Sequence, residues 1–100
     1  MKTEKVKSLL HLAQKGRMLE VGKTAVLILI KRKKAALVIV ALDSSEKLKR
    51  EVELECRRFS IPLYLFGSKD QLGEILGRDE VAVIAVSNKN LASELKKYLL

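Results

Sequence analysis

The chain has 100 residues, of which 48% are hydrophobic and 4% aromatic, and its formal net charge is +8. This composition predicts one domain over residues 1–100 with an aliphatic core, and it excludes an intrinsically disordered chain. The apolar runs are too short to cross a bilayer, and residues 1–16 lack the apolar centre of a signal peptide, so we expect a cytoplasmic protein with no membrane partner. The single cysteine, Cys56, fits a reducing compartment, and we expect it to be a small core residue.

Positive charge is concentrated in the first third of the chain. Residues 1–34 hold ten lysines or arginines against Glu4 and Glu20, whereas residues 35–80 hold seven basic and nine acidic residues. Such asymmetry favours a polyanionic partner, with a merely solvated basic surface as the alternative.

The first predicted element is a helix over residues 4–14, where four apolar residues recur at helical spacing, and Gly16 is expected to end it as a C′ glycine. A short strand follows at residues 18–21. The apolar run 25–30 is ambiguous, because its β-branched residues favour a strand while Thr24, a candidate N-cap, favours a helix.

Strands and helices alternate in the rest of the sequence. Strands are predicted at 37–42, 63–66 and 81–86. A helix is predicted from Asp43 or Ser44, its candidate caps, to about Phe59, and another over 88–99. A short helix begins at the capping box of Ser68 and Gln71, runs to Leu76 and is stopped by Gly77. This alternation predicts an α/β fold with helices on both faces of a small sheet.

Gly22-Lys23-Thr24 has the sequence of the end of a phosphate-binding P-loop. That loop requires another glycine five positions before Gly22, and Arg17 stands there instead. No strand precedes the segment with the apolar character that such enzymes have, so a nucleotide hydrolase is excluded.

No other catalytic or metal-binding arrangement is visible. His11 is the single histidine and has no cysteine cluster near it, and Glu51, Glu53 and Glu55 are spaced two apart, which spreads them around a helix as a solvated face. We therefore expect neither an enzyme nor a cofactor or metal.

Three segments together resemble one family of small ribosomal proteins. They are Leu9–Met18, Ala35–Ser45 and, most specifically, Ile61–Gly73 followed by Gly77. The resemblance covers nearly the whole chain and is to the superfamily whose archaeal members, the large-subunit proteins L7Ae and L30e, bind kink-turn RNA. The chain is more similar to its short bacterial branch, found in translation-related operons.

The resemblance implies an α/β fold, a three-layer α/β/α sandwich with a four-stranded mixed sheet, in which residues 25–30 are helical. It also implies a non-catalytic protein that binds structured, kink-turn-like RNA in a ribosomal or translation-related context. The family holds RNA with a helix start of pattern Gly-x-Asn-Glu-x-x-Lys and with the loop before the last strand. Here Gly22 is kept, whereas Thr24, Ala25 and Ile28 replace the asparagine, glutamate and lysine.

The candidate RNA-binding residues combine this helix start with the basic residues around it. Backbone N–H groups after Gly22 are expected to hold a phosphate and Thr24 to contact a base edge or a 2′-hydroxyl, unless Thr24 is simply an N-cap. The remaining candidates supply charge to phosphates: Arg17, Lys23, Lys31, Lys33, Lys34 and, in the loop 77–81, Arg78. For Lys31–Lys34 the alternative is a solvated helix end stabilised by the helix dipole.

A second reading is a protein-interaction module. The segment 25–30 has more apolar faces than a surface helix needs. If Ile28 is exposed, it marks a patch for a protein partner or for self-association.

Overall fold

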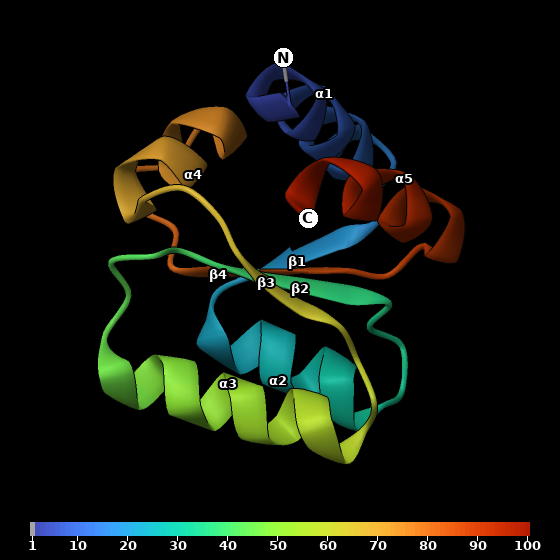
Figure 1. The fold of residues 1–100 in the computed structure, drawn as a ribbon, viewed down its shortest axis with the longest axis vertical. Coiled ribbons are helices and arrows are strands. Elements are labelled where there is room, and N and C mark those ends of the chain that lie inside the picture. Colours follow the sequence, from blue (N-terminus) through green and yellow to red (C-terminus); the bar gives the residue numbers. More distant parts are fainter. Residues whose placement is uncertain (1) are drawn as a thin grey trace.

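Helices and strands alternate along residues 2–100, which the computed structural model describes. The helices are α1 (Lys2–Lys15), α2 (Lys23–Lys31), α3 (Glu46–Arg58), α4 (Lys69–Leu76) and α5 (Lys89–Leu99), and the strands are β1 (Leu19–Val21), β2 (Leu37–Val40), β3 (Leu63–Leu65) and β4 (Val83–Val86). The strands form one sheet in the order β1-β4-β2-β3, with β2 and β3 parallel and the other two pairings antiparallel. Helices α1, α4 and α5 cover one face and α2 and α3 the other (Figure 1), which confirms the predicted α/β/α sandwich with a mixed sheet.

The central strands supply both halves of the core. In β2, Leu37 and Ile39 pack toward α1, α4 and α5, whereas Val38 and Val40 pack toward α2 and α3, and all four are fully buried. Successive side chains of a strand point to opposite faces, so one strand contributes to both cores. Burial on both faces is the reason for the unbroken apolar runs in the sequence.

The ambiguous run 25–30 is helical and forms most of α2. Val26 and Ile30, one turn apart, are fully buried against the sheet, so tertiary packing outweighs the strand propensity of the β-branched residues. The prediction that Thr24 is the N-cap is wrong: Gly22 is the N-cap, and its carbonyl oxygen accepts the first helical hydrogen bond from Val26 N–H at 3.0 Å.

Helix α1 ends one residue later than predicted. Gly16 is not in the left-handed conformation; Arg17 is, with φ 55°. Met18 N–H donates to the Ala13 carbonyl at 2.8 Å and Arg17 N–H to the Gln14 carbonyl at 3.2 Å, which is a Schellman motif with Arg17 at C′. Gly16 instead makes room for Met18, since a Cβ at residue 16 would lie 2.6 Å from Met18 Cε.

The predicted cap of α3 is also wrong. Ser45 caps the helix by accepting from Leu48 N–H, whereas the Asp43 carboxylate accepts from Lys69 N–H at 2.8 Å and the buried Ser44 hydroxyl donates to the Ala82 carbonyl at 3.1 Å. Both side chains tie the β2–α3 connection to its neighbours. The strands are shorter than predicted: β2 ends at Val40, β3 ends at Leu65 and β4 begins at Val83.

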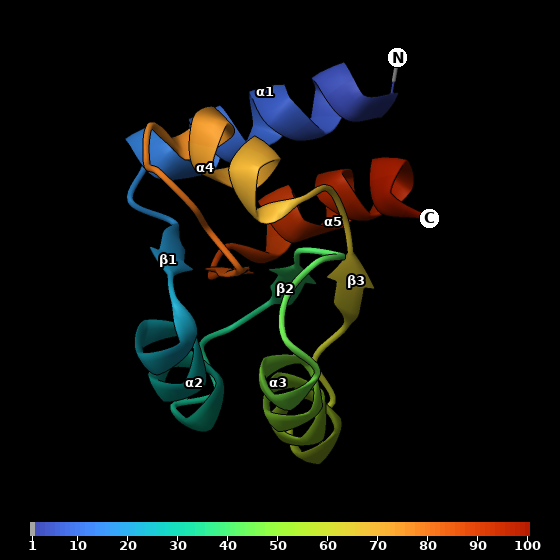
Figure 2. The same cartoon turned by 90° about the vertical axis from the view of Figure 1, so that its left-hand side faces the viewer.

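The connections lie at two opposite ends of the sheet (Figure 1). We call one the glycine end; it holds residue 22 and the connections 41–45, 66–68 and 77–82, and it faces the viewer in Figure 2. The other is the lysine end, which holds the connections 16–18, 32–36, 59–62 and 87–88.

Candidate nucleic-acid interface

Gly22 forms the turn that leads from β1 into α2. Its backbone angles are φ 96° and ψ 155°, a combination that is essentially restricted to glycine. Its N–H donates to the Val83 carbonyl at 3.0 Å, which fixes the turn to the beginning of β4. The start of α2 is therefore held rigidly at the glycine end.

The N-terminus of α2 has no side-chain cap. In α3, α4 and α5 a side chain accepts from the first turn, namely that of Ser45, Ser68 and Asn88, but Gly22 offers none. The first N–H groups of a helix have no intrahelical acceptor and carry the positive end of the helix dipole. The open first turn can therefore accept an anion, such as a phosphate, at the glycine end.

Lys23, the first residue of α2, forms an ion pair with a residue of α3. Its Nζ lies 2.6 Å from Oε2 of Glu51 in α3, and both side chains are partly exposed. The hydrogen bond from Lys23 lowers the pKa of the Glu51 carboxyl below its ordinary value, which keeps that carboxyl ionised. Sequence reasoning placed Glu51 on a solvated face and so missed this pair.

Thr24 and Arg78 are both exposed and both lie at the glycine end. The backbone around Arg78 is ordered by its own hydrogen bonds: Arg78 N–H donates to the Gly73 carbonyl at 2.8 Å, and Val81 N–H to the Lys69 carbonyl at 3.0 Å. The α4–β4 connection is thus a loop that folds back on α4 and is fixed to it by backbone hydrogen bonds. The loop leads into β4 beside the Gly22 turn. Its charge is not purely positive, because two acidic residues follow Arg78.

The other four candidates lie at the lysine end. Arg17, Lys31, Lys33 and Lys34 are exposed, but they follow α1 or close α2 and its connection to β2. The nine residues of α2, about 13 Å of helix, separate the three lysines from the helix start, and β1 separates Arg17 from it. The structure therefore divides the predicted site in two.

Two further lysines join the group at the lysine end. Lys89 lines a groove of about 360 Å³ together with Lys33 and Lys34, and it also lines a neighbouring groove of about 480 Å³ together with Lys96. Lys89 and Lys96 are seven residues apart in α5, a spacing that places them on one face. The seven-residue spacing can be seen in the sequence, but the sequence does not show that the α2–β2 connection lies beside α5.

The histidine and the cysteine have structural roles. His11 Nε2 lies 2.8 Å from the Ile75 carbonyl oxygen, which joins α1 to α4. Cys56 is buried, and burial together with the nearby Glu53 and Glu55 charges raises the pKa of its thiol to about 11. Among residues 2–100, no group of three or more His, Cys, Asp or Glu side chains is placed to hold a metal ion.

The remaining acidic residues of α3 pair within their own helix. Glu53 binds Arg57 at 2.7 Å and Glu55 binds Arg58 at 3.3 Å.

In the part of the chain that the structure describes, no helix combines the length and apolarity needed to cross a membrane.

The fold and its glycine-led helix define a small α/β/α protein with an anion-accepting helix start. The chain belongs to the ribosomal protein L7Ae/L30e/S12e/Gadd45 family, whose model matches residues 4–96. It is 29% identical over 87 residues to the RNA-binding protein YlxQ of Bacillus subtilis (strain 168), covering 87% of each chain.

Two solved structures share this fold. A protein of unknown function from Bacillus halodurans C superposes with a TM-score of 0.91 at 28% identity, over 95% of this chain and 96% of the other. The Giardia lamblia 15.5kD RNA binding protein superposes with a TM-score of 0.82 at 21% identity, over 98% of this chain and 84% of the other, and at that identity the likeness concerns the fold alone.

Proposed function

We propose that the protein binds structured, kink-turn-like RNA without catalysing a reaction, in a ribosomal or translation-related setting in the cytoplasm. Membership of the L7Ae family and the RNA-binding relative from Bacillus subtilis support this function. The observation that carries it is the uncapped, glycine-led start of α2 beside the α4–β4 loop, because this is where the fold leaves backbone donors open to an anion.

The proposed mechanism uses backbone groups for position and one side chain for contact with the nucleotide. The Gly22 turn lets a phosphate approach the first N–H groups of α2 closely. The Thr24 hydroxyl then bonds a base edge or a 2′-hydroxyl of an unstacked nucleotide, and Arg78 approaches a phosphate from the loop. Lys23 exchanges its Glu51 partner for a phosphate on binding.

The four basic residues at the lysine end take no part in holding that nucleotide. Lys31, Lys33 and Lys34 lie at the far end of α2 from Gly22, and Arg17 lies at the far end of β1 from it. Within this proposal they contact phosphates of the flanking RNA.

The test compares a kink-turn RNA with a straight duplex of equal length at physiological salt, with Kd measured by fluorescence anisotropy. We expect the wild type to bind the kink-turn RNA more tightly. Thr24→Val removes only the hydroxyl and should weaken kink-turn binding about five- to tenfold, because about one hydrogen bond is lost. Thr3→Val, the same change in exposed α1, is the matched control and should alter nothing. Equal affinity for both RNAs would reject kink-turn recognition.

A protein-interaction function is the second candidate, because Ile28 is 47% exposed on α2. In this alternative the apolar side chain contacts a protein partner or a second copy of the chain. Size-exclusion chromatography with light scattering on the wild type and on Ile28→Glu tests self-association. A monomer in both cases argues against it.

A further inference from the structure

The two ends of the sheet differ sharply in charge. At the lysine end, the four connections and the helix residues that border them hold eight basic and no acidic residues: Lys15, Arg17, Lys31, Arg32, Lys33, Lys34, Arg58 and Lys89. At the glycine end, the corresponding set holds three basic and four acidic residues: Lys23, Lys69, Arg78, Asp43, Glu46, Asp79 and Glu80. The positive potential of this basic chain therefore centres on the end opposite to the Gly22 turn.

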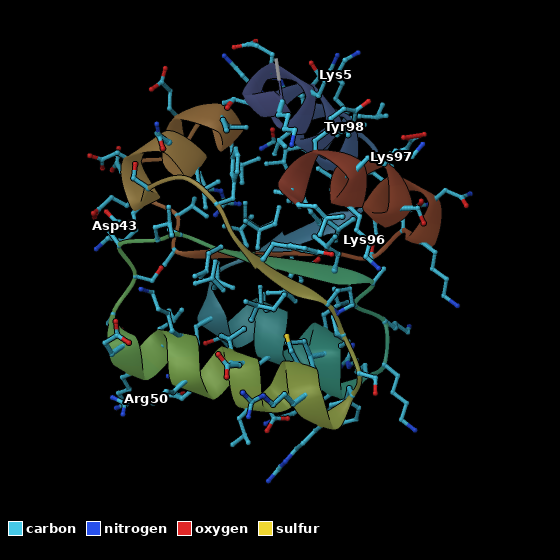
Figure 3. The ribbon with its side chains drawn as sticks, viewed as in Figure 1. Lys5, Asp43, Arg50, Lys96, Lys97 and Tyr98 are labelled. Carbon is cyan, nitrogen blue, oxygen red and sulfur yellow. The ribbon has the colours of Figure 1, made fainter. Side chains whose placement is uncertain are left out.

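The lysines of that end are free to bind. Within residues 2–100, none of Lys33, Lys34, Lys89 and Lys96 forms an ion pair. They border the two adjoining grooves, which share Lys89 and an apolar floor at Ala35 and Ala36. Lys96 lies between α5 and the lysine end of the sheet, on the other side of the molecule from Asp43 (Figure 3).

The backbone at the lysine end provides an independent observation. Three helices end there in residues with positive φ that are not glycine: Arg17 (55°), Lys33 (60°) and Ser60 (55°). The positive-φ residues that belong to the glycine end, Gly22, Gly67 and Gly77, are all glycines. A side chain in the left-handed region costs free energy that glycine avoids, and retained strain of this kind concentrates at functional surfaces. Two of the three strained residues are basic.

We propose that the lysine end is a second RNA-binding surface, which holds the sugar–phosphate backbone of a duplex flanking the element bound at the glycine end. Several lysines along two adjoining grooves match an anion that repeats its charge at every nucleotide, and they need no base contact. Because α2 joins the two ends, with Gly22 before its first residue and Lys33 and Lys34 beyond its last, one continuous RNA reaches both surfaces. The proposal rests on the proposed function, since it assigns the flank of the same RNA.

The test uses two kink-turn RNAs, one with both stems short and one with a stem extended by a full turn of duplex. Lys34→Glu with Lys89→Glu removes one lysine from each of the two segments that line the smaller groove. Lys2→Glu with Lys5→Glu makes the same change of net charge at the exposed start of α1 and is the matched control. Anisotropy titrations over a range of salt concentrations give Kd and the salt slope for each pair.

We expect the wild type to bind the extended RNA more tightly and with a steeper salt slope. The Lys34/Lys89 variant should bind the extended RNA about tenfold more weakly, with the slope reduced by about 1.5 to 2, as expected for two lost phosphate contacts. Its affinity for the short RNA should match that of the control variant. Thermal unfolding monitored by circular dichroism should show both variants folded.

Two results would overturn the proposal. One is an equal loss of affinity for the extended RNA in the test and control variants, which would reduce the effect to net charge. The other is unchanged affinity of the Lys34/Lys89 variant for the extended RNA. This result would show that the lysine end does not bind RNA, and an acidic protein would then be the partner to test. A straight duplex, added as a third RNA, distinguishes failure of the proposed function. In that case the wild type would bind the kink-turn RNAs no more tightly than the straight duplex, while the Lys34/Lys89 variant would still lose affinity for the duplex.

Discussion

Lys23 Nζ lies 2.6 Å from Glu51 Oε2, so the first residue of α2 is bound to a carboxylate of α3. The pair stands beside the uncapped helix start, where an RNA phosphate is proposed to bind. A carboxylate and a phosphate present similar anionic oxygens to an ammonium group. If RNA binds at the glycine end as proposed, Glu51 competes with it for Lys23, and the affinity then depends partly on a residue that does not contact RNA.

Glu51→Gln should strengthen RNA binding. Removal of the carboxylate releases Lys23 and takes one negative charge away from the helix start. We expect Kd for a kink-turn RNA to fall about two- to fivefold, since exposed ion pairs are weak, and the salt slope to steepen by less than about one. Fluorescence anisotropy across a salt series measures both quantities.

Glu53→Gln is the control for that experiment. Glu53 is also on α3, but it pairs with Arg57 of its own helix. Its substitution removes the same charge without releasing Lys23. An equal gain in affinity from both variants would show that only the net charge matters, which would contradict the competition by Glu51.

The same ion pair makes a pH-dependent contribution to stability. The pKa of Glu51 lies below its ordinary 4.5 in the folded protein because of the hydrogen bond from Lys23. The stabilisation is therefore present above pH 4.5 and is lost as the pH falls through the folded-state pKa. Thermal unfolding should show a Tm slightly higher for the wild type than for Glu51→Gln near neutral pH, and the difference should shrink as the pH falls below 4.5. A difference that persists in acid would assign the effect to packing of the Gln side chain.

The fold could be read from the sequence because alternating apolar strands and capped helices specify a layered α/β architecture. The Ser68 and Gln71 capping box and the Gly77 stop were predicted and are both present. The run 25–30 could not be assigned locally, since burial of Val26 and Ile30 against a sheet formed by distant residues decides its conformation.

The candidate site was predictable only in part. The Gly22 turn could be predicted because the residue is a glycine. The Lys23–Glu51 ion pair could not, because it joins residues 28 positions apart and no regular spacing in the sequence predicts such a pair. The separation of Lys33 from Lys23 depends on α2 running from one end of the sheet to the other. The lysines that line the smaller groove come from α5 and the α2–β2 connection, and only the tertiary structure brings them together.

Lys33→Gly should stabilise the protein and weaken its binding to the extended RNA. Lys33 has φ 60° at the C′ position of α2, where Lys34 N–H donates to the Leu29 carbonyl at 3.1 Å. Glycine removes the left-handed strain, so we expect a gain of about 1 kcal/mol and a Tm higher by about 4–8 °C. Lys31→Gly, within α2, should instead cost up to about 1 kcal/mol. Denaturant titration of both variants checks the opposite signs.

The Cys56 thiol should be inert in the folded protein. Burial, followed by the charges of Glu53 and Glu55, raises its pKa from 9.0 to about 11, so near pH 8 the thiolate fraction is about 100-fold lower than in the unfolded chain. Reaction with a chromogenic disulfide should be at least that much slower in native buffer than in denaturant. A fast native reaction would show that α3 opens readily.

Gly73→Ala should destabilise the protein although it raises helix propensity. Gly73 lies within α4, where alanine is favoured over glycine by about 1 kcal/mol. A Cβ there would lie 2.6 Å from the Asp79 carbonyl oxygen and 2.8 Å from that of Arg78, so the α4–β4 loop must move. We expect a net loss of about 1–3 kcal/mol in denaturant titration and several-fold weaker binding of kink-turn RNA, because the loop beside the Gly22 turn is displaced. Glu74→Ala, at the exposed next position, should change stability by less than about 0.5 kcal/mol. Unchanged or increased stability of Gly73→Ala would show that the loop does not rest on this residue.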